Sequence, residues 1–212
     1  RRYFNVPDGP RGGEPDRMGA GSGFIYDKEG YILTNHHVID GGSEIEVTLN
    51  DKRTFEAELI GSEPSTDLAL LKIDLDNLPY LPLANSDSVR VGEWVLAVGN
   101  PYNLTSTVTA GIISAKGRDV LNNNNTTESY LQTDAVVNSG NSGGALVNTR
   151  GELIGINTAI IAPAGGNVGI GFAIPAEIAA PIVQQLRNGE AIERGYLGVS
   201  IQPVTDDLAA SL

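Results

Sequence analysis

One hydroxyl lies between glycines in the stretch Gly140-Asn141-Ser142-Gly143-Gly144, directly before the apolar run 145–147. A serine that acts as a nucleophile needs an exposed Oγ on a sharp turn, with backbone N–H groups directed at the oxygen that gains charge. Glycines supply the backbone conformations of such a turn and let a substrate carbonyl approach closely. The same five residues are also typical of an ordinary polar loop. The rest of the chain has to decide between these two interpretations.

The composition is that of a globular protein with many turns. The chain has 212 residues, of which 41% are hydrophobic and 19% charged, enough for one large domain or two small lobes. Its 26 glycines exceed the usual share of about 7%, which favours short strands and tight turns over long helices. The net charge of −12 argues against nucleic acid and anionic membrane surfaces as partners, because both select basic patches.

Several classes of site and location are made unlikely by what the sequence lacks. There is no cysteine, which removes disulfides, zinc-finger sites and cysteine nucleophiles. There is no uninterrupted apolar stretch of about 18 residues, so we expect no membrane insertion. The chain opens on Arg1-Arg2-Tyr3-Phe4 without a signal peptide. We therefore expect a processed or truncated piece of a longer protein.

Short apolar or alternating segments, separated by turn signals, predict two groups of strands and one helix. The first group comprises residues 23–27, 30–34, 44–49, 54–60 and 68–73, a spacing that suggests a small barrel or sandwich. The second comprises residues 94–98, 107–113, 130–133, 144–147, 153–156 and 169–174. A linker near 78–88 separates the groups, and 1–20 is predicted to be a loop or arm. A helix is predicted over 177–186, although Pro181 lies within it.

A nucleophilic serine needs a base, and the chain has two histidines, His36 and His37. Adjacent residues point in different directions, so both cannot serve one site. Two adjacent histidines could also bind a metal, but no carboxylates at ligand spacing accompany them, and either histidine could be purely structural. Asp67 is the candidate for orienting the base, because it directly precedes the apolar run 68–71, while most other acids lie in turns or on alternating strand faces.

The order histidine, aspartate, serine along the chain is the chymotrypsin order. With these residues in view, the sequence resembles the HtrA/Deg (DegP/DegQ-like) family of ATP-independent serine proteases. The matching runs are Gly21-Ser-Gly-Phe-Ile, Tyr31-Ile-Leu-Thr-Asn-His-His-Val38, Ser65-Thr-Asp-Leu-Ala-Leu-Leu-Lys72, Ala97-Val-Gly-Asn-Pro101, Thr109-Ala-Gly-Ile-Ile-Ser114, Gln132-Thr-Asp-Ala135, Gly140-Asn-Ser-Gly-Gly-Ala-Leu146 and Gly169-Ile-Gly-Phe-Ala-Ile-Pro175. Together they cover nearly everything from about residue 20 to 190.

The resemblance implies an all-β fold, a chymotrypsin-like double β-barrel with a C-terminal helix. It divides the chain into an arm over 1–20, a trypsin-like protease domain over 21–190 and the truncated start of a PDZ domain over 195–212. The family normally has a helix and a first barrel strand upstream of residue 1. We therefore expect an open edge in the first lobe unless that strand is supplied elsewhere.

In the family motif the catalytic histidine directly precedes valine, which selects His37, and Asp67 and Ser142 complete the triad. The resemblance implies that Ser142 attacks the scissile carbonyl, that His37 carries its proton, and that Asp67 holds the imidazole. It also implies an oxyanion hole made by the backbone N–H groups of Gly140 and Ser142, with Asn141 as a further candidate.

The resemblance further implies a specificity pocket and a regulatory loop. The pocket would be formed by Val137, Asn138, Thr158, Ala159 and Ile160, whose apolar walls favour a small aliphatic residue before the cut. Ala159 and Ile160 could equally be plain strand core. The segment 116–128 matches the family's sensor loop. Within it, Arg118 is a candidate relay residue, and a solvated surface arginine is the alternative.

The function expected from this resemblance is an ATP-independent serine endopeptidase that degrades unfolded or misfolded proteins without a metal or other cofactor. The resemblance also implies a homotrimer in the bacterial periplasm or cell envelope. The alternative is a chaperone-like module that binds unfolded chains and whose protease site is latent. A purely structural all-β domain would leave the coincidence of His37, Asp67 and Ser142 unexplained.

Overall fold

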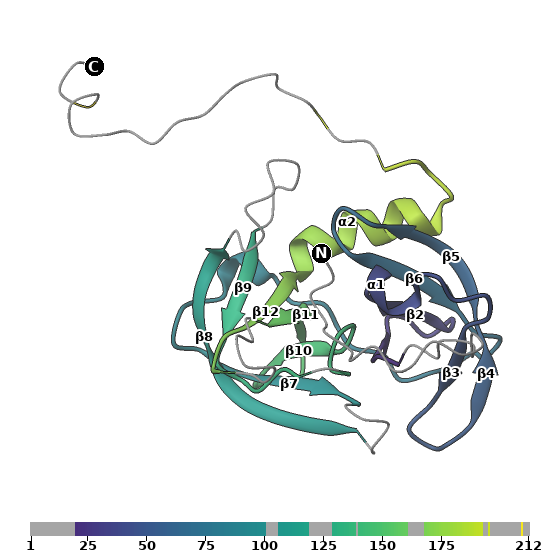
Figure 1. Cartoon of the computed structure of the whole chain (residues 1–212), viewed down its shortest axis with the longest axis horizontal. Helices are drawn as coiled ribbons and strands as arrows, with labels where there is room; N and C mark the ends of the chain where they lie inside the picture. Colours follow the sequence, from purple (N-terminus) through teal and green to yellow (C-terminus); the bar gives the residue numbers. More distant parts are fainter. Residues whose placement is uncertain are drawn as a thin grey trace, which may run out of the picture.

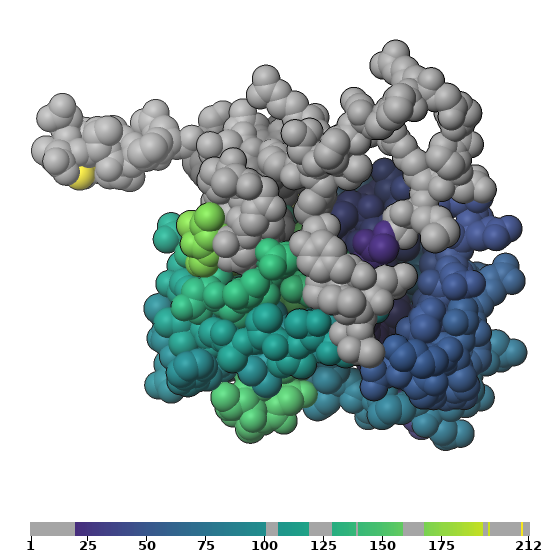
Figure 2. All heavy atoms as spheres, turned by 60° about the horizontal axis from the view of Figure 1, so that its bottom comes forward, coloured from purple at the N-terminus to yellow at the C-terminus, as the bar shows by residue number. Residues whose placement is uncertain are grey.

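The computed structural model describes residues 20–100, 106–118, 129–138, 140–160 and 168–192, together with Gly195 and Ala209. These residues form two β lobes that lie side by side, with one long helix across them (Figure 1). Figure 2 shows the first lobe in blue and the second in teal and green as two adjoining masses. Almost all of the predicted arm over 1–20 and of the predicted PDZ start over 195–212 lies outside the described residues.

The first lobe contains an open sheet and a separate hairpin. Its strands are β1 (Phe24–Ile25), β2 (Tyr31–Thr34), β3 (Glu46–Thr48), β4 (Thr54–Glu56), β5 (Glu58–Glu63) and β6 (Leu68–Lys72). The antiparallel sheet has the order β1-β2-β6-β5, and β3 pairs with β4. The central strands are apolar because they are covered on both faces, and Leu33, Leu68 and Leu70 are fully buried. A one-turn helix, α1 (His36–Ile39), follows β2 at a place where the sequence predicts no helix.

The second lobe is a closed barrel with the strand order β10-β11-β12-β9-β8-β7. Its strands are β7 (Trp94–Gly99), β8 (Thr107–Arg118), β9 (Tyr130–Thr133), β10 (Ala145–Asn148), β11 (Leu153–Ile160) and β12 (Gly171–Pro175). The barrel closes because β10 pairs with both β7 and β11. Val95, Ile113, Leu131, Leu146 and Ile154 fill its interior. Closure leaves this lobe without a free sheet edge.

The helix α2 (Ala176–Arg187) joins the cores of the two lobes. Pro175 is its N-cap residue, where the missing N–H of proline costs no helical hydrogen bond. Pro181 removes one bond inside the helix, yet the helix continues to Arg187 because one face is buried. That face packs in a single cluster with apolar side chains from β2 and β6 of the first lobe and from β11 and β12 of the second.

The structure confirms the predicted fold class, a mostly β protein with a closed barrel and few helices. Two strands are longer than predicted: β8 continues from residue 113 to Arg118, with two register shifts in its pairing with β9, and β11 continues from residue 156 to Ile160. The single strand predicted over 54–60 is divided between β4 and β5. In the first lobe, the described strands form an open sheet with β1 and β5 at its edges instead of a second closed barrel. No helix in the described ranges is long and apolar enough to cross a membrane.

Candidate active site

His37 lies on α1, three residues after the end of β2, and faces Asp67. Its Nδ1 is 2.7 Å from Asp67 Oδ2, and its backbone N–H donates to Asp67 Oδ1 at 2.9 Å. Both carboxylate oxygens therefore hold the same histidine. Because Nδ1 is engaged by the carboxylate, proton transfer by this histidine would involve Nε2.

Asp67 stands in the turn before β6 with a φ of 57°, a left-handed conformation that is uncommon for a residue other than glycine. Three hydrogen bonds fix its backbone. Its carbonyl accepts from Asn35 Nδ2 at 2.8 Å and from the His36 N–H at 3.2 Å, and its own N–H donates to Pro64 O at 3.3 Å. The surrounding backbone thus imposes the strained conformation that directs this carboxylate at His37.

Thr158, on β11, links the second lobe to Asp67. Its Oγ1 donates to Asp67 Oδ2 at 2.6 Å, and its carbonyl accepts from Ser142 Oγ at 3.3 Å. Thr158 is buried and the Asp67 side chain is 23% exposed, so this bond is partly shielded from water. The sequence suggests a pocket role for Thr158, but the structure engages its hydroxyl with the carboxylate. The only sequence signal for that contact is the polar pair Asn157-Thr158 inside an otherwise apolar strand.

Ser142 lies in a loop that packs directly on backbone of the first lobe. Gly140 and Gly143 flank it with φ values of 94° and 82°, which suit glycine. A Cβ on Gly143 would lie 2.2 Å from Ser22 O and 2.3 Å from Thr34 Oγ1. No side chain fits there, so the glycine after Ser142 is what lets the two lobes meet at this loop.

For the three residues predicted to form the oxyanion hole, the question is whether each backbone N–H can donate to a substrate oxygen. The N–H of Asn141 donates to Asn138 O at 2.9 Å, so this structure does not offer it to a substrate oxygen. The side chain of Asn141 is also buried, with Nδ2 3.4 Å from Val136 O. The role of the Gly140 and Ser142 N–H groups in an oxyanion hole stays a prediction.

The predicted pocket residues do not form one group. Val137 is 1% exposed and packs inside the barrel core against Gly171, so its side chain is not a pocket wall in this structure. Asn138 is partly exposed, and its carbonyl accepts the Asn141 N–H. Ala159 and Ile160 end β11, where their backbones pair with β12, and the prediction for their side chains lies outside the described residues.

Arg118 and His36 are placed outside the contact between His37 and Asp67. Arg118 ends β8, is exposed, and donates from Nε to Gln132 Oε1 at 3.1 Å. The predicted sensor loop beyond it, 119–128, lies outside the described residues. Nδ1 of His36 is buried without a hydrogen-bond partner in the structure. The described part of the chain contains no group of three or more histidine, aspartate or glutamate side chains that could hold a metal ion.

Known proteins are similar to this chain in sequence and in fold. The chain matches the trypsin-like peptidase domain family over residues 21–156. The chain belongs to that family. Its relatives place it in the HtrA/Deg branch: it is 46% identical over 211 residues to a protein of Chlamydia muridarum named "Probable periplasmic serine endoprotease DegP-like". It is 52% identical over 206 residues to a protein of the same name from Rhizobium meliloti.

These matches cover 99% and 96% of the chain but only 42% and 40% of the two relatives, so the chain spans about two fifths of their length. Among solved structures, the HtrA-type protease AlgW with a decapeptide aligns with a TM-score of 0.80 and 52% identity, over 90% of this chain and 58% of that chain. AlgW with a tripeptide gives a TM-score of 0.82 at the same identity, over 90% and 63%.

Proposed function

We propose that this chain is the protease domain of an ATP-independent serine endopeptidase that degrades unfolded or misfolded proteins in the bacterial periplasm. The observation that carries the proposal is the chain of contacts from His37 Nδ1 to Asp67, from Asp67 to Thr158, and from Thr158 to Ser142. It joins the base candidate of one lobe to the nucleophile candidate of the other. The names of the DegP-like relatives support the reaction class and the compartment.

In the proposed reaction, Ser142 Oγ attacks the scissile carbonyl carbon while His37 Nε2 takes its proton. The protonated His37 then gives that proton to the leaving amine, and an acyl-serine forms. Water attacks this ester in the second half, losing a proton to His37, which returns it to Ser142 Oγ. Asp67 keeps the imidazole oriented through Nδ1 and stabilises its charged form.

The resting position of the Ser142 hydroxyl is compatible with these reaction steps. The hydroxyl donates to Thr158 O at 3.3 Å, which is a long bond for an O–H donor and therefore weak. Turning the proton from that carbonyl towards His37 costs little. Gly140 and Ser142 supply the N–H groups for the oxyanion in our proposal, and losing one such donor typically lowers the rate about 10²- to 10³-fold.

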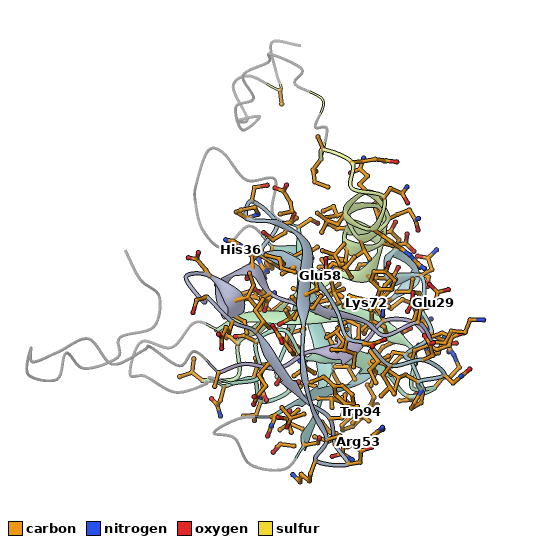
Figure 3. All side chains as sticks on the ribbon, turned by 90° about the vertical axis from the view of Figure 1, so that its right-hand side faces the viewer. Glu29, His36, Arg53, Glu58, Lys72 and Trp94 are labelled. Carbon is orange, nitrogen blue, oxygen red and sulfur yellow. The ribbon has the colours of Figure 1, made fainter. Side chains whose placement is uncertain are left out.

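The proposal also includes a homotrimer, and two exposed apolar side chains three residues apart support an interface between copies. Trp94 is 64% exposed and Val91 is 62% exposed, although large apolar side chains are normally buried. Figure 3 shows Trp94 in the lower part of the molecule, just above Arg53, and His36 in the upper part on the other side. An interface at Trp94 would thus leave the His37 segment accessible. Light scattering of the parent chain and of Trp94→Lys tests this part, and we expect the variant to be monomeric.

The decisive experiment compares the parent chain with Ser142→Ala. The parent should cleave reduced casein and be labelled by a fluorophosphonate, while Ser142→Ala should do neither and keep the parent's thermal unfolding midpoint. Sequencing the products tests the preference for a small aliphatic residue before the cut. Casein that is bound by both proteins but cut by neither would refute the enzyme and favour the chaperone-like alternative.

A further inference from the structure

Ser22 lies in the first lobe, two residues before β1, and has no part in the proposed reaction. It is 8% exposed. Its hydroxyl donates to the Gly140 carbonyl at 2.6 Å and accepts the Asn100 N–H at 2.6 Å. Its backbone N–H donates to the Ser142 carbonyl at 2.8 Å. One residue of the first lobe thus binds the carbonyls of both neighbours of Asn141 in the second lobe.

Ser22 is itself held in place by the first lobe. Its carbonyl accepts from Thr34 Oγ1 at 2.6 Å, and Thr34 precedes His37 by only three residues. The flanking glycines allow this close packing: a Cβ on Gly21 would lie 2.5 Å from Val38 Cγ1, and one on Gly23 would lie 3.1 Å from Ile32 Cγ2. Ser22 therefore connects the segment that carries the base to the loop that carries the nucleophile.

The hydroxyl of Ser22 controls one particular peptide plane. The Gly140 carbonyl and the Asn141 N–H belong to the same planar unit. Ser22 holds its oxygen, and the Asn138 carbonyl holds its N–H. This plane cannot turn without breaking both bonds. The N–H groups of Gly140 and Ser142 stand on its two sides, so the orientation of the plane sets the directions in which they point.

We infer that Ser22 is a positioning residue for the oxyanion hole, which orients the Gly140 and Ser142 N–H groups from the opposite lobe through its hydrogen bonds to the two carbonyls. This inference rests on the proposed function, because an oxyanion hole has a role only if Ser142 is a nucleophile. Ser22 touches no substrate in this scheme. Its loss should weaken binding of a tetrahedral adduct and leave binding of a planar peptide unchanged.

The size of the effect follows from the kind of contact that is lost. Removing an oxyanion donor outright costs about 10²- to 10³-fold in rate. Ser22→Ala keeps both donors and the Ser22 N–H bond, and it frees only the peptide plane, while leaving the Gly140 carbonyl and the Asn100 N–H without their buried partner. A displacement of the reacting groups by about 1 Å can cost about 10²-fold. We therefore expect a loss of about 10- to 100-fold.

The test uses the full chain and a probe pair that separates positioning from structure. The residues before a casein cleavage site of the parent are made as a peptide boronic acid, which forms a tetrahedral adduct with Ser142, and as the matching carboxamide, which does not. In Ser22→Ala we expect the fluorophosphonate labelling rate and the boronic acid affinity to fall about 10- to 100-fold. The carboxamide affinity should stay within about twofold of the parent. The carboxamide forms no tetrahedral adduct, and its binding therefore does not depend on the orientation of the oxyanion-hole N–H groups.

Ser86→Ala is the matched control. Ser86 is 1% exposed, and its Oγ accepts the Glu177 N–H at 3.1 Å at the start of α2. This variant loses an equally buried hydroxyl that has no bond to the Ser142 loop. We expect lower thermal stability with parent-like labelling and boronic acid affinity. An equal loss of boronic acid affinity in both variants would overturn the inference, as would equal weakening of both probes in Ser22→Ala.

Ser22→Cys covers the case in which Ser22→Ala does not fold. It keeps the shape of the side chain and substitutes a weak S–H donor, so we expect a smaller loss that again affects the boronic acid and spares the carboxamide. Parent-like boronic acid affinity in whichever variant folds overturns the role of Ser22. Failure of the proposed function looks different, because then the parent itself is not labelled. The parent is therefore measured first.

Discussion

The two lobes differ in how they are closed, and they contribute different parts of the site. The second lobe is a closed barrel in which every strand has two neighbours, whereas the first lobe is an open sheet that ends in the two-residue strand β1. The open lobe carries His37 and Asp67, and the closed lobe carries Ser142 and Thr158. The candidate site therefore depends on contacts that cross between the lobes, such as those of Thr158 and Ser22, and neither lobe holds it alone.

The open lobe obtains its cover from elsewhere in the chain. The largest apolar cluster contains Leu33, Leu68 and Leu70 of the first lobe together with Ile182 and Val183 of α2. Because α2 also packs against Ile156, Phe172 and Ile174 of the barrel, this cover is shared with the second lobe. We infer that the first lobe has the lower local stability, although it carries the base. The predictions below test this difference between the lobes.

The largest expected effect belongs to Asp67→Asn, which damages the first lobe's share of the site. An amide in place of the carboxylate cannot hold the Nδ1–H tautomer of His37, and the corresponding change in a serine protease triad costs about 10⁴-fold in kcat. We expect a similar loss in fluorophosphonate labelling and casein cleavage, with the thermal midpoint measured alongside. If Asp67→Asn kept more than a tenth of the parent's rate, the assignment of Asp67 would be wrong.

The second prediction compares the lobes without any substitution. Amides of β10 and β11 lie in a closed barrel, whereas β1 is a short edge strand and β3 pairs only with β4 in the described structure. Local opening is cheaper where few strands pair. We expect amides in β1 and β3 to exchange at least about 100-fold faster than those in β10 and β11. Equal protection in hydrogen-exchange mass spectrometry would show that the open lobe is as stable as the barrel.

The sequence predicts the local features well and the contacts between distant segments poorly. Glycines around Ser142 and most strands follow from patterns within ten or so residues. The order His37, Asp67, Ser142 is read along the whole chain, and the structure brings the side chains of His37 and Asp67 within hydrogen-bond distance. The bonds from Ser22 to Gly140 and from Thr158 to Asp67 join residues 118 and 91 positions apart. Such bonds leave no periodic signal.

Two of the local features that sequence patterns missed have physical reasons as well. The helix α1 has four residues and begins without a side-chain cap, so neither periodicity nor capping signals indicate it. Instead, the His36 and His37 N–H groups donate to Asp67 across the lobe. The extension of β8 is hidden because its irregular register breaks the alternation that identifies a strand.

The third prediction concerns the hydrogen bond between Thr158 of the second lobe and Asp67 of the first lobe. Thr158→Val keeps the shape of the side chain and removes the bond from Oγ1 to Asp67 Oδ2. A hydrogen bond to a charged group contributes about 1.5 to 3 kcal/mol, part of which is recovered as Asp67 keeps its bonds to His37. We expect about a 10-fold fall in labelling rate. Parent-like labelling would mean that the crossing bond is structural only.

The smallest expected effect tests the attachment of α2 to the open lobe. Arg187, in the last turn of α2, donates from Nη1 to Asp27 Oδ2 at 2.9 Å, pairs with Glu29, and lies 4.4 Å from the centre of the Tyr31 ring. Glu29 is seen beneath α2 in Figure 3. Because the arginine side chain is 30% exposed, we expect Arg187→Met to lower the free energy of unfolding by only about 1 kcal/mol.

Arg150→Met is the control for this last prediction, since Arg150 pairs with Glu152 on the second lobe and its side chain is 72% exposed. We expect no measurable change in its stability, because salt and water screen an exposed pair. In Arg187→Met, exchange should accelerate in β1 and β2 and stay unchanged in β10 and β11. If the labelling rate of Ser142 fell as well, the end of α2 would be coupled through β2 to His37. Local opening of the first lobe would then lower the reactivity of the site.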